Sequence, residues 1–180
     1  KNRINTIKKY HSLFQRGDTL LRGDASVSYL FYHDVPFKIS QYNPDSKIIV
    51  MLRDPINRAF SHYLMDHRLG LISESFDSII YKESTHKNAH LFYQQYIEVS
   101  EYSRQIKRYL EIFSHKNIYF IDYEDFKNNT SDVLSKIVKF LGLDANTGFH
   151  PNLITKHNTY SAARNRIIKS IYSFVYLRKI

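Results

Sequence analysis

Short apolar runs alternate along this chain with longer segments in which apolar residues recur every three or four positions. The β-branched run at 48–50 is bounded by charge and predicts a buried strand covered by helices on both faces. A run at 117–123 predicts a second strand, and 19–26 predicts a short strand leading into a loop. Helical spacing predicts helices at 2–14, 36–42, 56–64, 76–81, 91–113, 130–141 and 161–177.

The junction between the strand at 48–50 and the helix after it carries the clearest functional signal. Asp54 is expected to cap the helix, and Pro55 stands at its first position, where a missing N–H costs nothing. A strand, a tight turn and a helix place ligands at the carboxyl ends of the strands in open α/β sheets. The sequence therefore predicts an α/β fold with a ligand site at this turn.

Two side chains at this junction suit an anion. Arg53 follows the end of the strand, and its guanidinium is planar, always charged and able to bind a phosphate through two parallel hydrogen bonds. Ser61 follows about two helical turns later, roughly 12 Å along the axis, on a different face from the apolar stripe. The two would grip one anion between them. The alternative is that Arg53 pairs with Asp54 or another carboxylate and that Ser61 is only solvated.

Composition narrows the function classes without choosing among them. The 180 residues suffice for one domain, 1–180, and the net charge of +9 favours anionic ligands such as nucleic acid, acidic polysaccharide or a nucleotide. The absence of cysteine excludes disulfides, thiolate catalysis and zinc–cysteine sites, and favours a bacterial cytoplasmic location over a Golgi lumen. No apolar run approaches the roughly 18 residues of a membrane span, so we expect a soluble chain.

Residues 47–63 resemble the 3′-phosphate-binding segment of sulfotransferases that use 3′-phosphoadenosine 5′-phosphosulfate (PAPS). In that family a strand ends in Arg-Asp-Pro, and an Arg-Ala pair and Ser-x-Tyr follow. The resemblance implies that Arg53 and Ser61 bind the 3′-phosphate. It also implies a three-layer fold of the P-loop NTPase-like kind, with a central parallel sheet. The activity implied is transfer of a sulfuryl group from PAPS, without a metal, to a hydroxyl or amine, and we expect the acceptor to be a carbohydrate.

Residues 23–30 resemble a second segment of the family, Gly-Glu-x-Ser-Pro-Ser-Tyr-Leu, and depart from it at Asp24 and Val27. A carboxylate within about 3 Å of an acceptor hydroxyl can take its proton, so Asp24 is a candidate base. Its alternative role is to cap the loop or to pair with a basic neighbour. His33 is the other titratable candidate nearby, and the sequence does not rank the two.

Later segments extend the resemblance. The Tyr-Glu-Asp after the second strand matches the family's order, and we expect Glu124 to form an ion pair rather than to bind magnesium. His86 and His90 share a helical spacing but lack a third ligand, so no metal site is expected there. In the family a loop closes over the cofactor, which makes Lys156 and Arg164 candidates for binding it; each would otherwise be a solvated cation.

The family's N-terminal phosphosulfate loop, Lys-x-Gly-Thr-Thr/Ser, has no counterpart in the sequence. The resemblance covers about 20–164, so we expect either a chain that begins inside the domain or a binding remnant; a start at Lys1 favours the first. The alternatives are a non-catalytic nucleotide-binding protein of the same fold and a basic nucleic-acid-binding domain. The basic residues are scattered along the chain and form no single stripe, which disfavours the nucleic-acid-binding domain. The acceptor and the oligomeric state are not predicted.

Overall fold

The computed structural model describes residues 6–14 and 21–144 of the chain. Two parallel strands, β1 (Ile48–Leu52) and β2 (Ile118–Asp122), pair in register from Ile48 with Ile118 to Leu52 with Asp122. The helices are α1 (Ile7–His11), α2 (Val35–Tyr42), α3 (Pro55–Leu69), α4 (Phe76–Ile80), α5 (Ala89–Tyr96), α6 (Tyr102–Ile112), α7 (Tyr123–Asn128) and α8 (Thr130–Leu141), with 3-10 turns η1 (Glu98–Ser100) and η2 (His115–Asn117).

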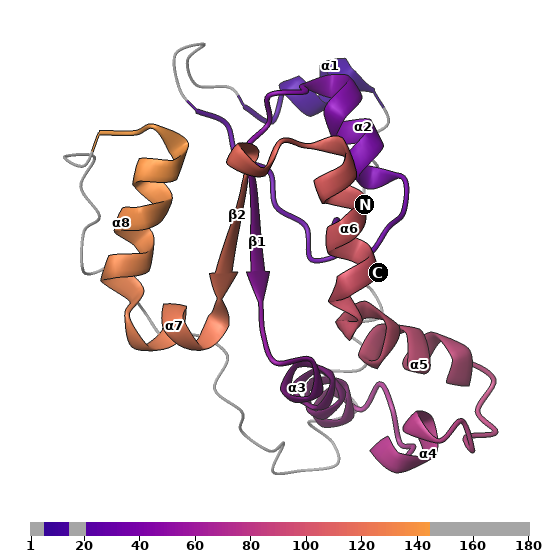
Figure 1. The fold of residues 1–180 in the computed structure, drawn as a ribbon. Helices are drawn as coiled ribbons and strands as arrows, with labels where there is room; N and C mark the ends of the chain where they lie inside the picture. Colours follow the sequence, from indigo (N-terminus) through magenta and orange to yellow (C-terminus); the bar gives the residue numbers. More distant parts are fainter. Residues whose placement is uncertain (1–5, 15–20, 145–180) are drawn as a thin grey trace.

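The sheet lies between two layers of helices, with α2 and α6 on one side and α8 on the other (Figure 1). Val50 and Ile118 are buried in one cluster with Tyr109 and Phe113 of the α6 segment. On the other side the ring of Tyr119 lies 5.2 Å from the ring of Phe140 of α8. The predicted three-layer α/β fold with a parallel sheet is therefore confirmed.

Helical cover of β1 is incomplete among the described residues. Ile49 and Met51 remain 41% and 45% exposed; they alternate with Val50, which faces α6, and α8 on the other side of the sheet packs against β2. On the face that carries these two side chains, the helical cover by the described residues is therefore partial.

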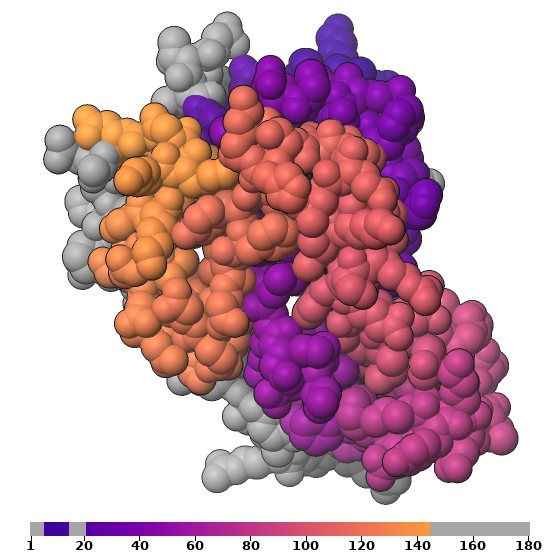
Figure 2. Space-filling view, in the orientation of Figure 1, coloured from indigo at the N-terminus to yellow at the C-terminus, as the bar shows by residue number. Residues whose placement is uncertain are grey.

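The segments from α3 to α5 form a lobe of their own at the lower right of Figure 2. Its core combines aromatic and aliphatic side chains and includes Tyr63 of α3, Ile79 of α4 and Tyr96 of α5. Tyr96 is completely buried, and its hydroxyl donates a hydrogen bond of 2.8 Å to Asp66 Oδ2. The face of α3 that carries Ala59 and Tyr63 packs into this core, and the opposite face of the helix is exposed.

Two predictions of secondary structure are wrong. Residues 21–26, which belong to the short strand expected at 19–26, have no strand partner. The single helix expected over 91–113 is broken into α5, η1 and α6. The side chain of Gln105 supports this break, since its Nε2 donates to the carbonyl oxygens of Glu98, Val99 and Glu101.

None of the helices in the described ranges is long and apolar enough to cross a membrane. The helix predicted at 161–177 lies outside those ranges, as do Lys156 and Arg164, so their assignments stay predictions.

Candidate functional site

The turn after β1 has the predicted geometry. Asp54 Oδ1 accepts a hydrogen bond of 2.7 Å from the backbone N–H of Asn57, and Pro55 is the first residue of α3. At the far end Gly70 adopts φ 72°, a left-handed conformation that favours glycine and ends the helix. The strand, the cap and the helix are therefore a direct consequence of the local sequence, and they fix where Arg53 leaves the sheet.

Arg53 is partly buried at the carboxyl end of β1. Its guanidinium carbon lies 4.9 Å from the centroid of the Tyr123 ring, which follows β2. Its Nε is buried and has no hydrogen-bond partner. A buried donor without a partner is costly, so this atom is a position where a ligand oxygen would add a hydrogen bond.

Tyr102, the first residue of α6, borders the same place. Burial raises the pKa of its hydroxyl, while the charge of Arg58 and a hydrogen bond with the Arg53 backbone act against that rise. Figure 2 shows an opening between α3 and α6 beside the end of β1. Arg53 thus has two tyrosine neighbours: the Tyr123 ring contacts its guanidinium, and the Tyr102 hydroxyl contacts its backbone.

Ser61 is exposed on α3, as predicted. It stands two positions after the buried Ala59, about 200° round the helix axis, on the side away from the aromatic core. Its hydroxyl is therefore available to a ligand. The convergence of Ser61 and Arg53 on one anion stays a prediction.

The side chain of Arg58 holds α3 against the next segments. Its Nη1 donates to the carbonyl oxygens of Gln95 and Tyr96 and to Ser100 Oγ, and its Nη2 lies 3.2 Å from His62 Nδ1. Burial lowers the pKa of the guanidinium. Since Arg58 is one turn from Ser61 on α3, this network fixes the orientation of the helix that carries Ser61.

We expect this network to make stability depend on pH through His62. The imidazole lies between Arg58 and Asp66 of α3 and contacts the ring of Tyr96 of α5. Burial lowers the pKa of His62 and Arg58 lowers it further, while Asp66 opposes the shift. As the pH falls below about 6.5, the unfolded chain takes up the proton first, so the stability given by neutral His62 is present above that pH and lost below it.

The measurement is urea unfolding of wild type and His62→Gln from about pH 7.5 to 5.5. Wild type should lose stability towards acid, and the variant should lose less. His33→Gln is the control, because His33 is exposed and should leave the acid sensitivity unchanged. An identical pH slope in wild type and His62→Gln would contradict the expectation.

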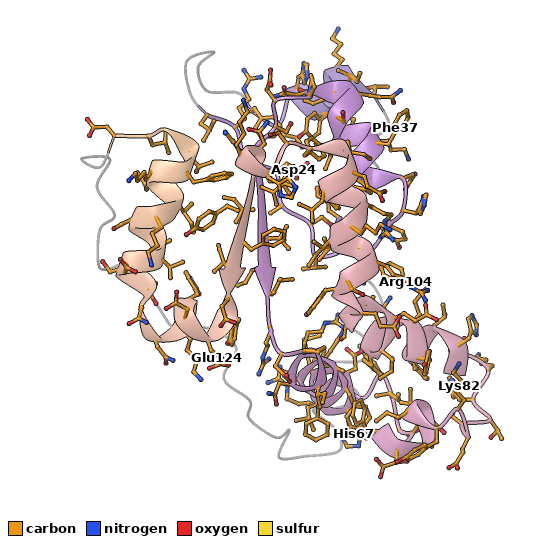
Figure 3. All side chains as sticks on the ribbon, viewed as in Figure 1. Asp24, Phe37, His67, Lys82, Arg104 and Glu124 are labelled. Carbon is orange, nitrogen blue, oxygen red and sulfur yellow. The ribbon has the colours of Figure 1, made fainter. Side chains whose placement is uncertain are left out.

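The structure does not bring Asp24 to Arg53. Asp24 lies beside the amino-terminal ends of the strands (Figure 3), whereas Arg53 follows the carboxyl end of β1. Its Oδ2 accepts hydrogen bonds from Tyr10 (3.1 Å) and Tyr29 (2.8 Å). Burial, followed by the charge of Asp24, raises the pKa of Tyr10 to about 12, and the hydrogen bond to Asp24 is the main cause that raises the pKa of Tyr29.

His33 is exposed and immediately precedes Asp34, the N-cap of α2. The roles of Asp24 and His33 as bases stay predictions. Locally, Asp24 accepts hydrogen bonds from both Tyr10 of α1 and Tyr29, and it thereby links α1 to the 21–32 segment.

The acidic residues after β2 have structural partners. Asp122 caps α7 by accepting from the backbone N–H groups of Glu124 and Asp125. Glu124 forms an ion pair of 2.9 Å with Lys127, which confirms the expected ion pair. Within the described ranges no group of three or more His, Asp or Glu residues could hold a metal ion.

Sequence reasoning missed the two tyrosines beside Arg53. Tyr123 follows a parallel strand that neighbours β1, so the rule that strand ends share one edge could have found it. Tyr102 was hidden because 91–113 reads as one uninterrupted helix, whereas the structure restarts the helix at this residue.

Known proteins match the chain over most of its length. The profile of the family described as "Sulfotransferase domain" matches residues 10–173. The chain is 25% identical over 173 residues to the bifunctional heparan sulfate N-deacetylase/N-sulfotransferase 1 of Caenorhabditis briggsae, covering 86% of this chain and 20% of that protein. It is 26% identical over 135 residues to the human heparan sulfate glucosamine 3-O-sulfotransferase 3B1, covering 74% and 34%.

A solved structure shares the fold. The crystal structure of a sulfotransferase from Alicyclobacillus acidocaldarius superposes with a TM-score of 0.64 at 30% identity, covering 83% of this chain and 64% of that one. The chain thus spans about a fifth and a third of the two curated relatives and about two thirds of the solved one. Since the family profile extends over nearly all of the 180 residues, the chain belongs to the sulfotransferase family.

Proposed function

We propose that this chain is the nucleotide-binding part of a sulfotransferase that moves a sulfuryl group from PAPS to a carbohydrate acceptor. The observation that carries the proposal is the state of Arg53: a guanidinium at the carboxyl end of a parallel strand, beside the Tyr123 ring, with a buried Nε that has no partner. A phosphate oxygen suits this donor, because charge-assisted hydrogen bonds from arginine to phosphate are among the stronger ones in proteins.

In this proposal Arg53 and Ser61 hold the 3′-phosphate, and Tyr102 and Tyr123 limit the space around it. Lys156 and Arg164 would add positive charge to the same nucleotide. PAPS supplies the sulfuryl group, and the protein contributes mainly positioning and stabilisation of charge. Asp24 or His33 would accept the proton of the acceptor hydroxyl or amine.

The carbohydrate acceptor is inferred from the relatives, whose names assign them to heparan sulfate. The net charge of +9 supports an acidic polysaccharide, since an excess of positive charge attracts a polyanion. A bacterial cytoplasmic location stays a prediction.

Nucleotide discrimination tests the proposal. Adenosine 3′,5′-bisphosphate should raise the unfolding temperature of the chain by about 5–10 °C at a hundred times its Kd. The matched control is adenosine 2′,5′-bisphosphate, which has the same charge and differs only in the position of one phosphate; it should give a smaller shift. The measurement is thermal unfolding by circular dichroism.

Equal shifts for the two isomers would contradict a specific 3′-phosphate site. If single-stranded DNA stabilises the chain more than either isomer and the effect falls steeply with salt, the nucleic-acid alternative replaces the proposal. Transfer of labelled sulfate from PAPS to heparosan, measured on the full-length protein, then separates an enzyme from a non-catalytic nucleotide-binding protein.

A further inference from the structure

A cavity of about 290 Å³ lies between α4 and α5, away from the proposed nucleotide site. Ser78, Ile79, Lys82, Ser84, Tyr93 and Glu98 line it together with Ala89 and His90. Lys82 is at the outer end of the α3–α5 lobe, whereas Glu124, which follows β2, lies on the other side of α3 (Figure 3). The cavity is therefore a separate feature of the lobe.

Lys82 is unusual among the residues that the structure describes, since no other non-glycine residue there has a positive φ; its φ is 59°. The backbone N–H of Lys82 donates to the Ile79 carbonyl oxygen at the end of α4. Glycine is the residue that normally ends a helix in this conformation, because it has no Cβ. The turn alone does not require a lysine, so its side chain must be explained separately.

The side chain of Lys82 is held at the wall of the cavity. Its Nζ lies 4.3 Å from the centroid of the Tyr93 ring, and this contact restricts the rotation of the lysine side chain. None of the ion pairs found among the described residues involves Lys82. The cavity thus has an ammonium group with no carboxylate partner.

Apart from Lys82, the cavity is lined mainly by apolar surface, and hydrogen-bond acceptors are among its few other polar groups. Ser78 Oγ donates to the Ser75 carbonyl oxygen, and Ser84 Oγ donates to Glu74 Oε2, so both hydroxyls have used their one proton. Glu98 adds a carboxylate and Ile79 an apolar wall. A ligand that fits this set carries hydroxyl donors and one negative charge.

From this juxtaposition we propose that the cavity between α4 and α5 binds one acidic sugar residue of the acceptor polysaccharide, with its carboxylate or sulfate facing Lys82 and its hydroxyls facing Ser78 and Glu98. The volume is slightly below the range of about 300–1,000 Å³ usual for drug-sized ligands, which suits a single sugar ring. The inference depends on the proposed carbohydrate acceptor. It adds a contact with the acceptor chain at a distance from the nucleotide.

Calorimetric titration tests it, with a heparosan hexasaccharide as the acidic probe and chitohexaose as the neutral one. Lys82→Gly removes the ammonium group and fits φ 59°, and Lys82→Asn removes the charge while keeping a polar side chain that tolerates this conformation. Each variant should bind the acidic probe about tenfold more weakly, the loss of one exposed charge-assisted contact. Neither should change the binding of chitohexaose.

Lys87→Ala is the matched control, because Lys87 is an exposed lysine of the same segment that does not line the cavity. It should bind the acidic probe as wild type does. Unchanged binding in both Lys82 variants, or a wild type that does not distinguish the two probes, would overturn the inference. Adenosine 3′,5′-bisphosphate is titrated in the same experiment. If wild type binds this nucleotide specifically but does not distinguish the two saccharides, only the cavity proposal is refuted. If wild type does not bind the nucleotide specifically, the proposed function is refuted.

Discussion

Arg53→Ala is expected to remove most of the preference of the chain for adenosine 3′,5′-bisphosphate over adenosine 5′-monophosphate. A hydrogen bond to a charged group contributes about 1.5–3 kcal/mol, so wild type should bind the bisphosphate roughly 10- to 150-fold more tightly. In the variant most of this difference should disappear, and Ser61 would remain as a contact to the phosphate. Arg53→Lys should recover only part of the difference, because lysine keeps the charge but not the planar fork. Isothermal titration calorimetry measures all three proteins.

Arg104→Ala is the control for this experiment. Arg104 is exposed on α6, at the edge of the structure away from the strands (Figure 3), so its removal lowers the net charge by the same amount without touching the site. It should retain the wild-type preference. If Arg53→Ala also retains it, the phosphate lies elsewhere and the assignment of the site to the end of β1 is wrong.

Tyr96→Ala should cause the largest loss of stability, about 3–5 kcal/mol, as other large-to-small substitutions of aromatic core residues do. Tyr96 is completely buried and contacts the rings of Tyr63 and Phe92 at 5.9 and 6.4 Å. Its removal leaves a cavity in the core of the α3–α5 lobe and a carboxylate, Asp66, without its hydroxyl donor. Urea unfolding measures the change, with the midpoint and the slope fitted together.

Two further substitutions separate packing from hydrogen bonding. Tyr96→Phe keeps the ring and removes only the donor to Asp66, so it should cost about 1–3 kcal/mol. Tyr81→Ala removes a tyrosine that is 71% exposed and should change stability by less than about 0.5 kcal/mol. A Tyr96→Ala protein as stable as Tyr81→Ala would show that the lobe does not depend on this ring.

Local sequence signals predicted the junction at β1 well, because each part of it is determined by adjacent residues. The apolar run, the Asp54 cap and Pro55 need no distant partner, and the structure has all three where the sequence places them. The exposure of Ser61 follows from helical spacing alone. These are the short-range features on which pattern reasoning is strongest.

Features that depend on distant residues were not predictable in this way. The break between α5 and α6 is supported locally by Gln105, whose partners lie 4 to 7 residues away, but also by Arg58, whose partners lie 37 to 42 residues away. The aromatic neighbours of Arg53 come from two different elements that only the fold brings together. The segment 21–26 contains Gly23, Asp24 and Ala25, residue types that are depleted in strands, and the structure ties it down through tyrosine hydroxyls that donate to Asp24.

The pairing of β1 with β2 has a consequence for how the protein folds. Ile48 pairs with Ile118, about 70 residues further along the chain, so the sheet closes only across the whole α3–α6 crossover. Such a high contact order slows folding, because the entropy of closing a long loop is lost before the strand contacts form. On a ribosome adding about 5–20 residues per second, Arg53 would emerge several seconds before Tyr123. A nascent chain that ends before β2 therefore has the arginine but not its aromatic neighbour, and the proposed phosphate site is complete only after Tyr123 has been added.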